Sequence, residues 1–178
     1  MRFGQSANIP YFLCGDDTVC LEAKLRVFKN DAIKDLWKKS RLIVWPDLYC
    51  MVSFDPKDRA SALNLVAKAA PFDHYFSIIC DQHEVAVILP DTIWNDWDAS
   101  VICRNSHGPF ACLTFDIPLD VEVAGYLQPA VNCLADAGIS IVPQCALIYD
   151  HVLVNERDLD AAICALTELR QKALSDEI

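Results

Sequence analysis

The chain has 178 residues, of which 53% are hydrophobic, so it is long enough to bury one large core or two small ones. Its formal net charge of -10 at pH 7 lacks the positive field that phosphate-backbone binding needs, so we expect no nucleic-acid partner. No apolar run is long enough to span a membrane and the N-terminus lacks a secretory signal, so we expect a cytoplasmic protein without a membrane partner.

The nine cysteines do not suggest a disulfide scaffold. Their number is odd, and most of them lie inside apolar runs. We therefore expect reduced, buried thiols.

The hydrophobic pattern of the N-terminal part changes twice. Residues 1–20 build no periodic face and are expected to form an arm, whereas residues 21–28 alternate apolar and charged side chains, as a half-buried strand does. Asn30 then offers an N-cap for a short helix that ends near Ser40.

The remainder of the first half predicts a strand, a helix and two further strands, at residues 48–54, 58–70, 75–80 and 85–89. The polar link at residues 81–84 is short, so the last two strands should form an antiparallel hairpin. Residues 93–106 are expected to form an irregular crossover.

The second half has a sharper pattern. It predicts strands at residues 110–115, 139–147 and 151–154, and helices that start near Val123 and Asn155. Gly138 suits the left-handed cap of the first of these helices. Pro129 lies inside that helix, so either the helix starts near Gln128 or it kinks at the proline.

The order strand, helix, strand, strand, helix therefore occurs twice. It predicts an α+β fold of two ferredoxin-like βαββα units, with antiparallel sheets and helices on one face. We place the arm at residues 1–20, the first unit with an N-terminal extension at 21–100, and the second unit at 108–178. Only a short polar tail follows Leu169, so the final strand of the second unit must be missing or come from elsewhere in the chain.

Three segments of the second unit resemble one known family. Gly125 lies thirteen residues before Gly138, which begins the sequence Gly-Ile-Ser, and the Tyr-Asp-His-Val-Leu-Val segment at residues 149–154 follows at the expected spacing. The N-terminal unit is weakly similar through Phe-Ser-Ile at residues 76–78 and Glu-Val-Ala-Val at 84–87. These features resemble the paired ACT-domain proteins, which include the CASTOR arginine sensors of the mTOR pathway.

This resemblance implies an ACT-type, non-enzymatic regulatory protein that binds an amino acid or a similar small molecule between two units. The implied ligand-binding residues include a glycine near a helix start and an aspartate able to hold an ammonium or guanidinium group. They are Gly125, Gln128, Ser140, Ile141 and Asp150. A homodimer would place Gly125 and Asp150 of one chain against Ser140 of the other, and a regulatory protein partner is also implied. We expect no catalytic residue, metal or cofactor.

Other interpretations remain open. The family's hydroxyl-rich strand before the aspartate is replaced here by Cys145-Ala146-Leu147, so the chain could be a ligand-free interaction module with a degenerate pocket. Gly125 could serve close packing alone, and Asp150 could be an ordinary turn residue. A metal site or enzyme built on Cys80 and His83 is a weak hypothesis, because one such pair is a poor zinc signature and Cys80 is expected to point into the core.

Overall fold

The computed structural model describes residues 27–69, 74–96 and 103–175. Its centre is one six-stranded antiparallel sheet with the strand order β2-β3-β1-β4-β6-β5. The elements, in chain order, are α2 (Asp31–Lys39), β1 (Arg41–Phe54), η1 (Pro56–Asp58), α3 (Arg59–Ala69), β2 (Ser77–Cys80), β3 (Val85–Pro90), α4 (Asp91–Asn95), β4 (Asn105–Asp116), α5 (Gln128–Asp136), β5 (Ile141–Cys145), β6 (Asp150–Asn155), η2 (Glu156–Asp158) and α6 (Leu159–Leu174).

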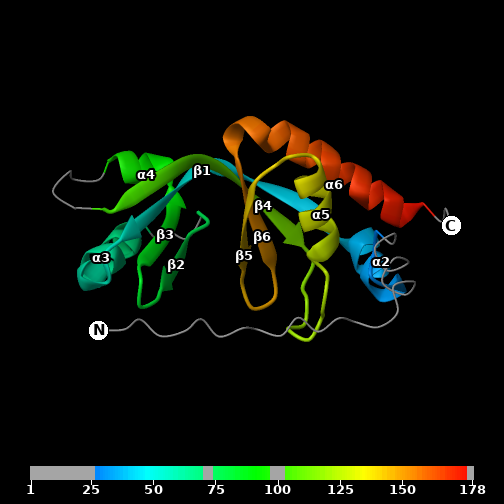
Figure 1. Ribbon diagram of the computed structural model, residues 1–178, viewed down its shortest axis with the longest axis horizontal. Helices are drawn as coiled ribbons and strands as arrows, with labels where there is room; N and C mark the ends of the chain where they lie inside the picture. Colours follow the sequence, from blue (N-terminus) through cyan, green and yellow to red (C-terminus); the bar gives the residue numbers. More distant parts are fainter. Residues whose placement is uncertain (1–26, 70–73, 97–102, 176–178) are drawn as a thin grey trace, which may run out of the picture.

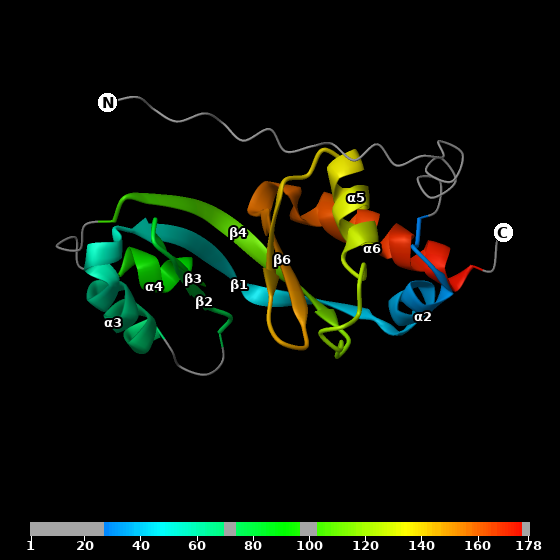
Figure 2. The same cartoon turned by 60° about the horizontal axis from the view of Figure 1, so that its bottom comes forward.

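The predicted α+β fold of two ferredoxin-like βαββα units is confirmed. The first unit consists of β1, α3, β2, β3 and α4, and the second of β4, α5, β5, β6 and α6. Figures 1 and 2 show the two units at opposite ends of the molecule, with β1 and β4 running between them. The arm at residues 1–20 and most of the strand at 21–28 lie outside the described residues; Val27 and Phe28 form no strand.

Each unit borrows a strand from the other. The part of β1 from Tyr49 onward pairs with β3, whereas its first part, from Arg41 to Leu48, pairs with the half of β4 that also pairs with β6. The start of β4 in turn pairs with the end of β1. The missing final strand of the second unit is therefore supplied by the first half of β1.

This exchange explains why two strands are longer than predicted. β1 begins at Arg41 rather than near residue 48, and β4 begins at Asn105 rather than near residue 110. The pairing shifts register between Val44 and Leu48 and again after Tyr49. Gly108 lies at the second shift with φ +156°, and a Cβ there would approach the Tyr49 carbonyl oxygen to 2.8 Å, so the close passage of the two strands requires glycine. The short helix α4 overlaps the start of the irregular crossover expected at residues 93–106, and β4 overlaps its end.

The segment around α5 is also shorter than its hydrophobic pattern suggests. α5 begins at Gln128, with Pro129 in its first turn, which was one of the two predicted alternatives. The start near Val123 was therefore wrong. Gly138 has φ +72° and ends the helix as predicted. β5 covers only part of the predicted strand, because Ala146 donates its N–H to the Tyr149 carbonyl, 2.9 Å away, and begins the turn.

The helices cover one face of the sheet. On β1 and β4, alternate residues such as Phe54 and Phe115 face the helices, and they are buried with α3 in the first unit and with α5 and α6 in the second. None of the described helices is long and apolar enough to cross a membrane.

The helix α2, which precedes the first unit in sequence, packs on the second unit. Its N-cap is Asn30, as predicted, whose side chain accepts a hydrogen bond from the Ile33 N–H at 2.9 Å. Trp37 is 2% exposed and stacks on Tyr126 with ring centroids 5.4 Å apart. Its indole N–H donates to the Tyr126 carbonyl at 3.0 Å. α2 therefore fixes the loop that leads from β4 to α5.

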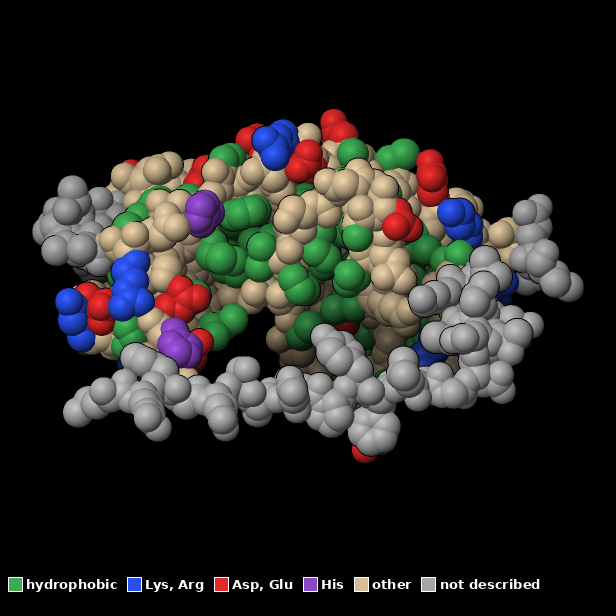
Figure 3. All heavy atoms as spheres, in the orientation of Figure 1, with side chains coloured by type: hydrophobic (Ala, Val, Ile, Leu, Met, Phe, Trp, Pro, Cys, Tyr) green, Lys and Arg blue, Asp and Glu red, His purple; other side chains and the backbone are tan. Residues whose placement is uncertain are grey.

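The helix-free face of the sheet carries a third cluster, which contains Tyr49, Cys112 and Leu153. The edge strands β2 and β5 approach each other over this face, where the Ser77 hydroxyl donates to Gln144 Oε1 at 3.1 Å. Figure 3 shows hydrophobic side chains gathered between the β2–β3 and β5–β6 hairpins, where the surface is hollowed. The sheet is therefore curled, and part of its open face is buried without helices.

A buried polar chain on this face predicts a pH dependence of stability. The Trp45 indole N–H donates to Thr114 Oγ1 at 2.7 Å, so the Thr114 hydroxyl is free to donate to His151 Nδ1, also 2.7 Å away. With the Thr114 hydroxyl as the donor, His151 Nδ1 carries no proton, as in the neutral imidazole. Burial lowers the pKa of His151, although the negative charge of Asp150 opposes the shift.

We therefore expect the melting temperature to fall as the pH drops below about 6.5, because the unfolded chain then takes up a proton that folded His151 resists. The loss should continue until the pH reaches the lowered pKa of the folded state. His151→Asn should melt at a lower temperature near pH 8 but show a weaker fall between pH 7 and 5. Calorimetry across this range measures both slopes, and equal slopes would contradict the assignment.

Candidate functional site

The tip of the second unit brings together two loops that the sequence placed in the ligand site. The loop between β4 and α5 contains Gly125, and the turn between β5 and β6 leads to Asp150. The Leu119 N–H of the first loop donates to the Ile148 carbonyl of the turn at 2.8 Å. This hydrogen bond holds the loops side by side.

Asp150 is the centre of a small polar cluster at this tip. It is the first residue of β6 and pairs across the hairpin with Cys145, so both side chains lie on the helix-covered side of the sheet. The Tyr126 hydroxyl donates to Ser40 Oγ at 2.7 Å, and both residues are buried. Asp150 itself is only half-buried, so the residue keeps contact with solvent.

The electrostatics confirm that these groups are neighbours. Burial, with a contribution from the Asp150 charge, raises the pKa of the Tyr126 phenol to about 12. Burial and the adjacent Asp150 carboxylate raise the pKa of the Cys145 thiol to about 11. Both groups are therefore neutral at physiological pH, and Asp150 supplies the negative charge of the cluster.

Gly125 lies on the outer side of the same loop. Its φ of +95° is a backbone conformation that favours glycine, and a Cβ at this position would lie 3.2 Å from Cδ of Lys29 and 3.8 Å from Oε1 of Gln128. Gly125 and Gln128 are thus neighbours in this loop. The lysine stem packs over the glycine, which places a positive charge beside the loop.

Ser140 and Ile141 lie away from this cluster. Ile141 pairs with Val154, at the opposite end of the β5–β6 hairpin from the pair of Cys145 and Asp150. Ser140 is exposed, just before β5 begins. Within one chain, the five predicted ligand-binding residues therefore do not form a single site.

Sequence reasoning missed three residues of this tip. Tyr126 was assigned to a helical face, although it is buried in the loop with its hydroxyl on Ser40. Ser40 and Lys29 come from the segment around α2, far from the second unit in sequence. No local pattern signals their contact, because the fold alone brings α2 to this unit.

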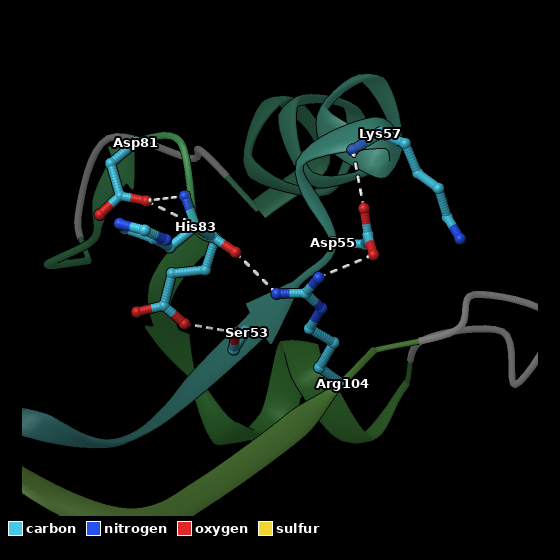
Figure 4. A network of polar contacts seen from close by, with 7 residues as sticks. Ser53, Asp55, Lys57, Asp81, His83 and Arg104 are labelled. Atoms are coloured by element: carbon cyan, nitrogen blue, oxygen red, sulfur yellow. Dashed lines mark hydrogen bonds and ion pairs between the residues drawn. The ribbon is translucent and has the colours of Figure 1, made fainter. Parts of the chain in front are cut away.

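The first unit has a corresponding tip, and the side chain of an arginine occupies that tip. Arg104 precedes β4 as Ser40 precedes β1, and Asp55 follows the end of β1. The Arg104 guanidinium donates to Asp55 Oδ2 at 2.8 Å and to the His83 carbonyl at 2.6 Å (Figure 4). A hydrogen bond to the Lys57 N–H and the Arg104 guanidinium lower the pKa of Asp55.

The surrounding contacts fix this arrangement further. Asp81 accepts hydrogen bonds from the N–H groups of His83 and Glu84, at 2.6 and 2.8 Å, and the Ser53 hydroxyl donates to Glu84 (Figure 4). These backbone hydrogen bonds lower the pKa of Asp81. The tip of the first unit is thus closed by its own side chains.

The cysteines and histidines of the described residues do not suggest metal chemistry. No group of three or more His, Cys, Asp or Glu side chains in this part of the chain is arranged to hold a metal ion. Cys80 is exposed, so the expectation that it points into the core was wrong. The described cysteines are all free, but only Cys112 is fully buried, because most of the others lie at strand edges or on helix surfaces.

Comparison with known proteins supports the fold. Residues 105–168 match the family model described as the ACT domain. A comparison with curated proteins gives no match.

Several solved structures share the fold at low sequence identity. A Vibrio cholerae protein of unknown function, described as a possible transport protein, has a TM-score of 0.59 and 17% identity, covering 78% of this chain and 95% of that one. An Agrobacterium tumefaciens protein has a TM-score of 0.56 and 17% identity, over 74% and 89%. The ligand-free regulatory subunit of aspartate kinase from Thermus thermophilus has a TM-score of 0.53 and 9% identity, over 72% and 97%.

Proposed function

We propose, from the ACT-domain match of residues 105–168 and the polar cluster at Asp150, that this chain is a non-enzymatic regulatory protein that binds an amino acid or a similar small metabolite. The observation that carries the proposal is the half-buried Asp150 carboxylate beside the neutral Tyr126 and Cys145. The occurrence of the same fold in a regulatory subunit of aspartate kinase is consistent with it.

The charges of the tip suit a zwitterion. Asp150 can accept hydrogen bonds from an ammonium or guanidinium group. The α-carboxylate can contact the backbone at Gly125, where Lys29 adds a positive charge. Arginine is one candidate ligand through the resemblance to the CASTOR sensors.

The difference between the two units favours a single ligand site per chain, in the second unit. In the first unit the Arg104 guanidinium already occupies the acceptors at Asp55 and His83. In the second unit the short Ser40 side chain stands at the corresponding position, and none of the described residues places such an internal cation on Asp150. The first unit would therefore act as scaffold.

The proposed site needs a second copy of the chain to be complete. Ser140 and Ile141 lie at the far end of the β5–β6 hairpin, on an edge strand of the sheet. A homodimer would bring them to Asp150 and Gly125 of the other chain. The free cysteines suit the reducing cytoplasm, where we place the protein.

The ligand proposal predicts a thermal shift that depends on Asp150. One of the twenty amino acids, at millimolar concentration, should raise the melting temperature of the full chain, because a ligand that binds the native state stabilises it by mass action. Asp150→Asn should abolish the shift. Asp55→Asn is the matched control, since it changes the equivalent tip of the first unit, and its shift should equal that of the wild type.

Two results would contradict this assignment. The first is that no amino acid stabilises the wild-type chain, and the second is that Asp150→Asn and Asp55→Asn respond alike. The second result would show that a bound amino acid does not contact Asp150.

A second candidate function, a ligand-free interaction module, is favoured by one observation. The same tip exposes large apolar side chains: Val121 is 81% exposed, Leu147 79% and Ile148 46%. Such side chains are typical of a protein-binding surface when they occur together. If Leu147→Ser abolished binding of a stoichiometric partner while no amino acid changed the melting temperature, this function would replace the first.

A further inference from the structure

A groove separates α5 and α6 on the outer surface of the helix layer. It has a volume of about 440 Å³. Each helix contributes residues at positions i, i+3, i+4 and i+7 to the lining of the groove, and Val27 also lines it. Its floor is apolar and its rim is charged. The lining includes Val27, Pro129, Cys133, Asp136, Glu168 and Lys172. Figures 1 and 2 both show α5 lying against α6.

The described chain begins at one end of this groove. Lys29 packs over Gly125, just before α5, and two residues earlier Val27 lines the groove. Val27 is itself 45% exposed, so it leaves room beside it. The described part of the chain therefore begins beside the groove.

Residues 21–26, which lie outside the described part of the chain, have the pattern that the groove requires. Leu21, Ala23 and Leu25 have the same parity as Val27, so an extended chain would present all four to one side. Six extended residues span about 20 Å. The nine residues of α5 span about 14 Å, so the segment is long enough to follow the groove.

The charges are also complementary. The rim carries the two acidic residues Asp136 and Glu168 against the single base Lys172. The segment carries Lys24 and Arg26 against the single acid Glu22. A net negative rim thus faces a net positive segment, which favours this occupant over an acidic peptide.

We propose that residues 21–26 bind as an extended strap in the groove between α5 and α6, continuing from Val27. The strap covers the apolar floor at Pro129 and Cys133. It also holds Lys29 against Gly125. The strap would bind in the groove whether or not the tip of the second unit binds an amino acid.

Cys133 provides a native reporter for the strap. It lines the groove, and burial raises the pKa of its thiol. In the full-length protein, Leu25→Asp should release the strap, because it would place a carboxylate on the apolar floor between two acidic rim residues. The rate at which iodoacetamide alkylates Cys133, followed by peptide mass spectrometry, should then rise about tenfold.

Two controls accompany this measurement. Cys164 is exposed on α6 outside the groove lining, so its alkylation rate should stay the same in both proteins. Glu22→Gln changes an alternate, outward position of the strap and should leave Cys133 as protected as in the wild type. Equal alkylation of Cys133 in the wild type and in Leu25→Asp would overturn the proposal.

A cross-link tests the occupant directly. Leu25→Cys should form an intramolecular disulfide with Cys133 on mild oxidation, whereas Lys24→Cys, at an outward position, should form much less of it. A chain that stays monomeric on a non-reducing gel and yields the peptide joined at residues 25 and 133 supports the strap. A disulfide-linked dimer through the same residues would assign the groove to a second copy and overturn the proposal.

Discussion

Residues 103–178 produced alone should show no cooperative unfolding transition, although they contain the complete second βαββα unit. In the full chain, the side of β4 that faces away from β6 is covered by the first half of β1, from Arg41 to Leu48. The isolated fragment would expose that strand edge and lose the α2 contacts at Trp37, both of which belong to the stable core. Circular dichroism during heating measures the transition.

A complementary fragment should restore folding. Residues 27–102 supply α2 and β1, so mixing or co-expressing the two fragments should recover a single transition and a one-to-one complex. Residues 49–102 are the matched control, because they keep β1 from Tyr49 onward but lack α2 and the strand that the second unit borrows. A sharp transition in residues 103–178 alone would show that the borrowed strand is dispensable.

Trp37→Ala should cause the largest loss of stability among single substitutions in α2, about 3–5 kcal/mol of unfolding free energy. The indole is 2% exposed and contacts Tyr126 and Phe115, with ring centroids 5.4 and 5.5 Å away. Truncation leaves a cavity between α2 and the sheet, and it removes the hydrogen bond to the Tyr126 carbonyl. Urea denaturation measures the change.

Two neighbouring substitutions separate the contributions. Trp37→Phe keeps an aromatic ring but leaves the Tyr126 carbonyl unpaired, so we expect a smaller loss of about 1–3 kcal/mol. Leu36→Ala changes a half-buried residue of the same helix and should cost less than Trp37→Ala. Equal losses for Leu36→Ala and Trp37→Ala would show that the stack on Tyr126 contributes little.

Much of the fold follows from local patterns in the sequence. The alternation and spacing of apolar residues predicted α2, α3, α6, the β2–β3 hairpin and the strands β5 and β6, because these elements bury one face each and show that face in their own sequence. Gly138 and Asn30 marked helix ends through side-chain chemistry that acts over a few residues. Pro129 likewise indicated where α5 could begin.

The shared strands could not be predicted in the same way. The first half of β1 contains Pro46 and has no clean alternation, and its pairing with β4 is decided by residues far away in sequence. The sequence showed that the second unit lacks its final strand, but it did not show which segment supplies that strand. The β-propensity of a segment depends on its own residues, whereas its pairing depends on a second strand that is distant in the sequence.

Only part of the candidate site could be predicted from local sequence patterns. Gly125, Gln128 and Asp150 lie at turns and helix starts, where family spacing and backbone chemistry leave a signal in the sequence. Ser40 and Lys29 reach the tip of the second unit only because α2 packs there. The placement of Ser140 and Ile141 at the far end of the hairpin follows from the register of β5 and β6.

The strand exchange also determines when β1 can pair during translation. The first half of β1 leaves the ribosome long before Asp116, the residue that pairs with Arg41, has been translated. Until then this strand has no partner on either edge, and its exposed Ile43 and Val44 are open to other nascent chains. Pairing of this strand can therefore be completed only after β4 has been translated, and the need for chaperones should be greatest during translation of the residues between β1 and β4.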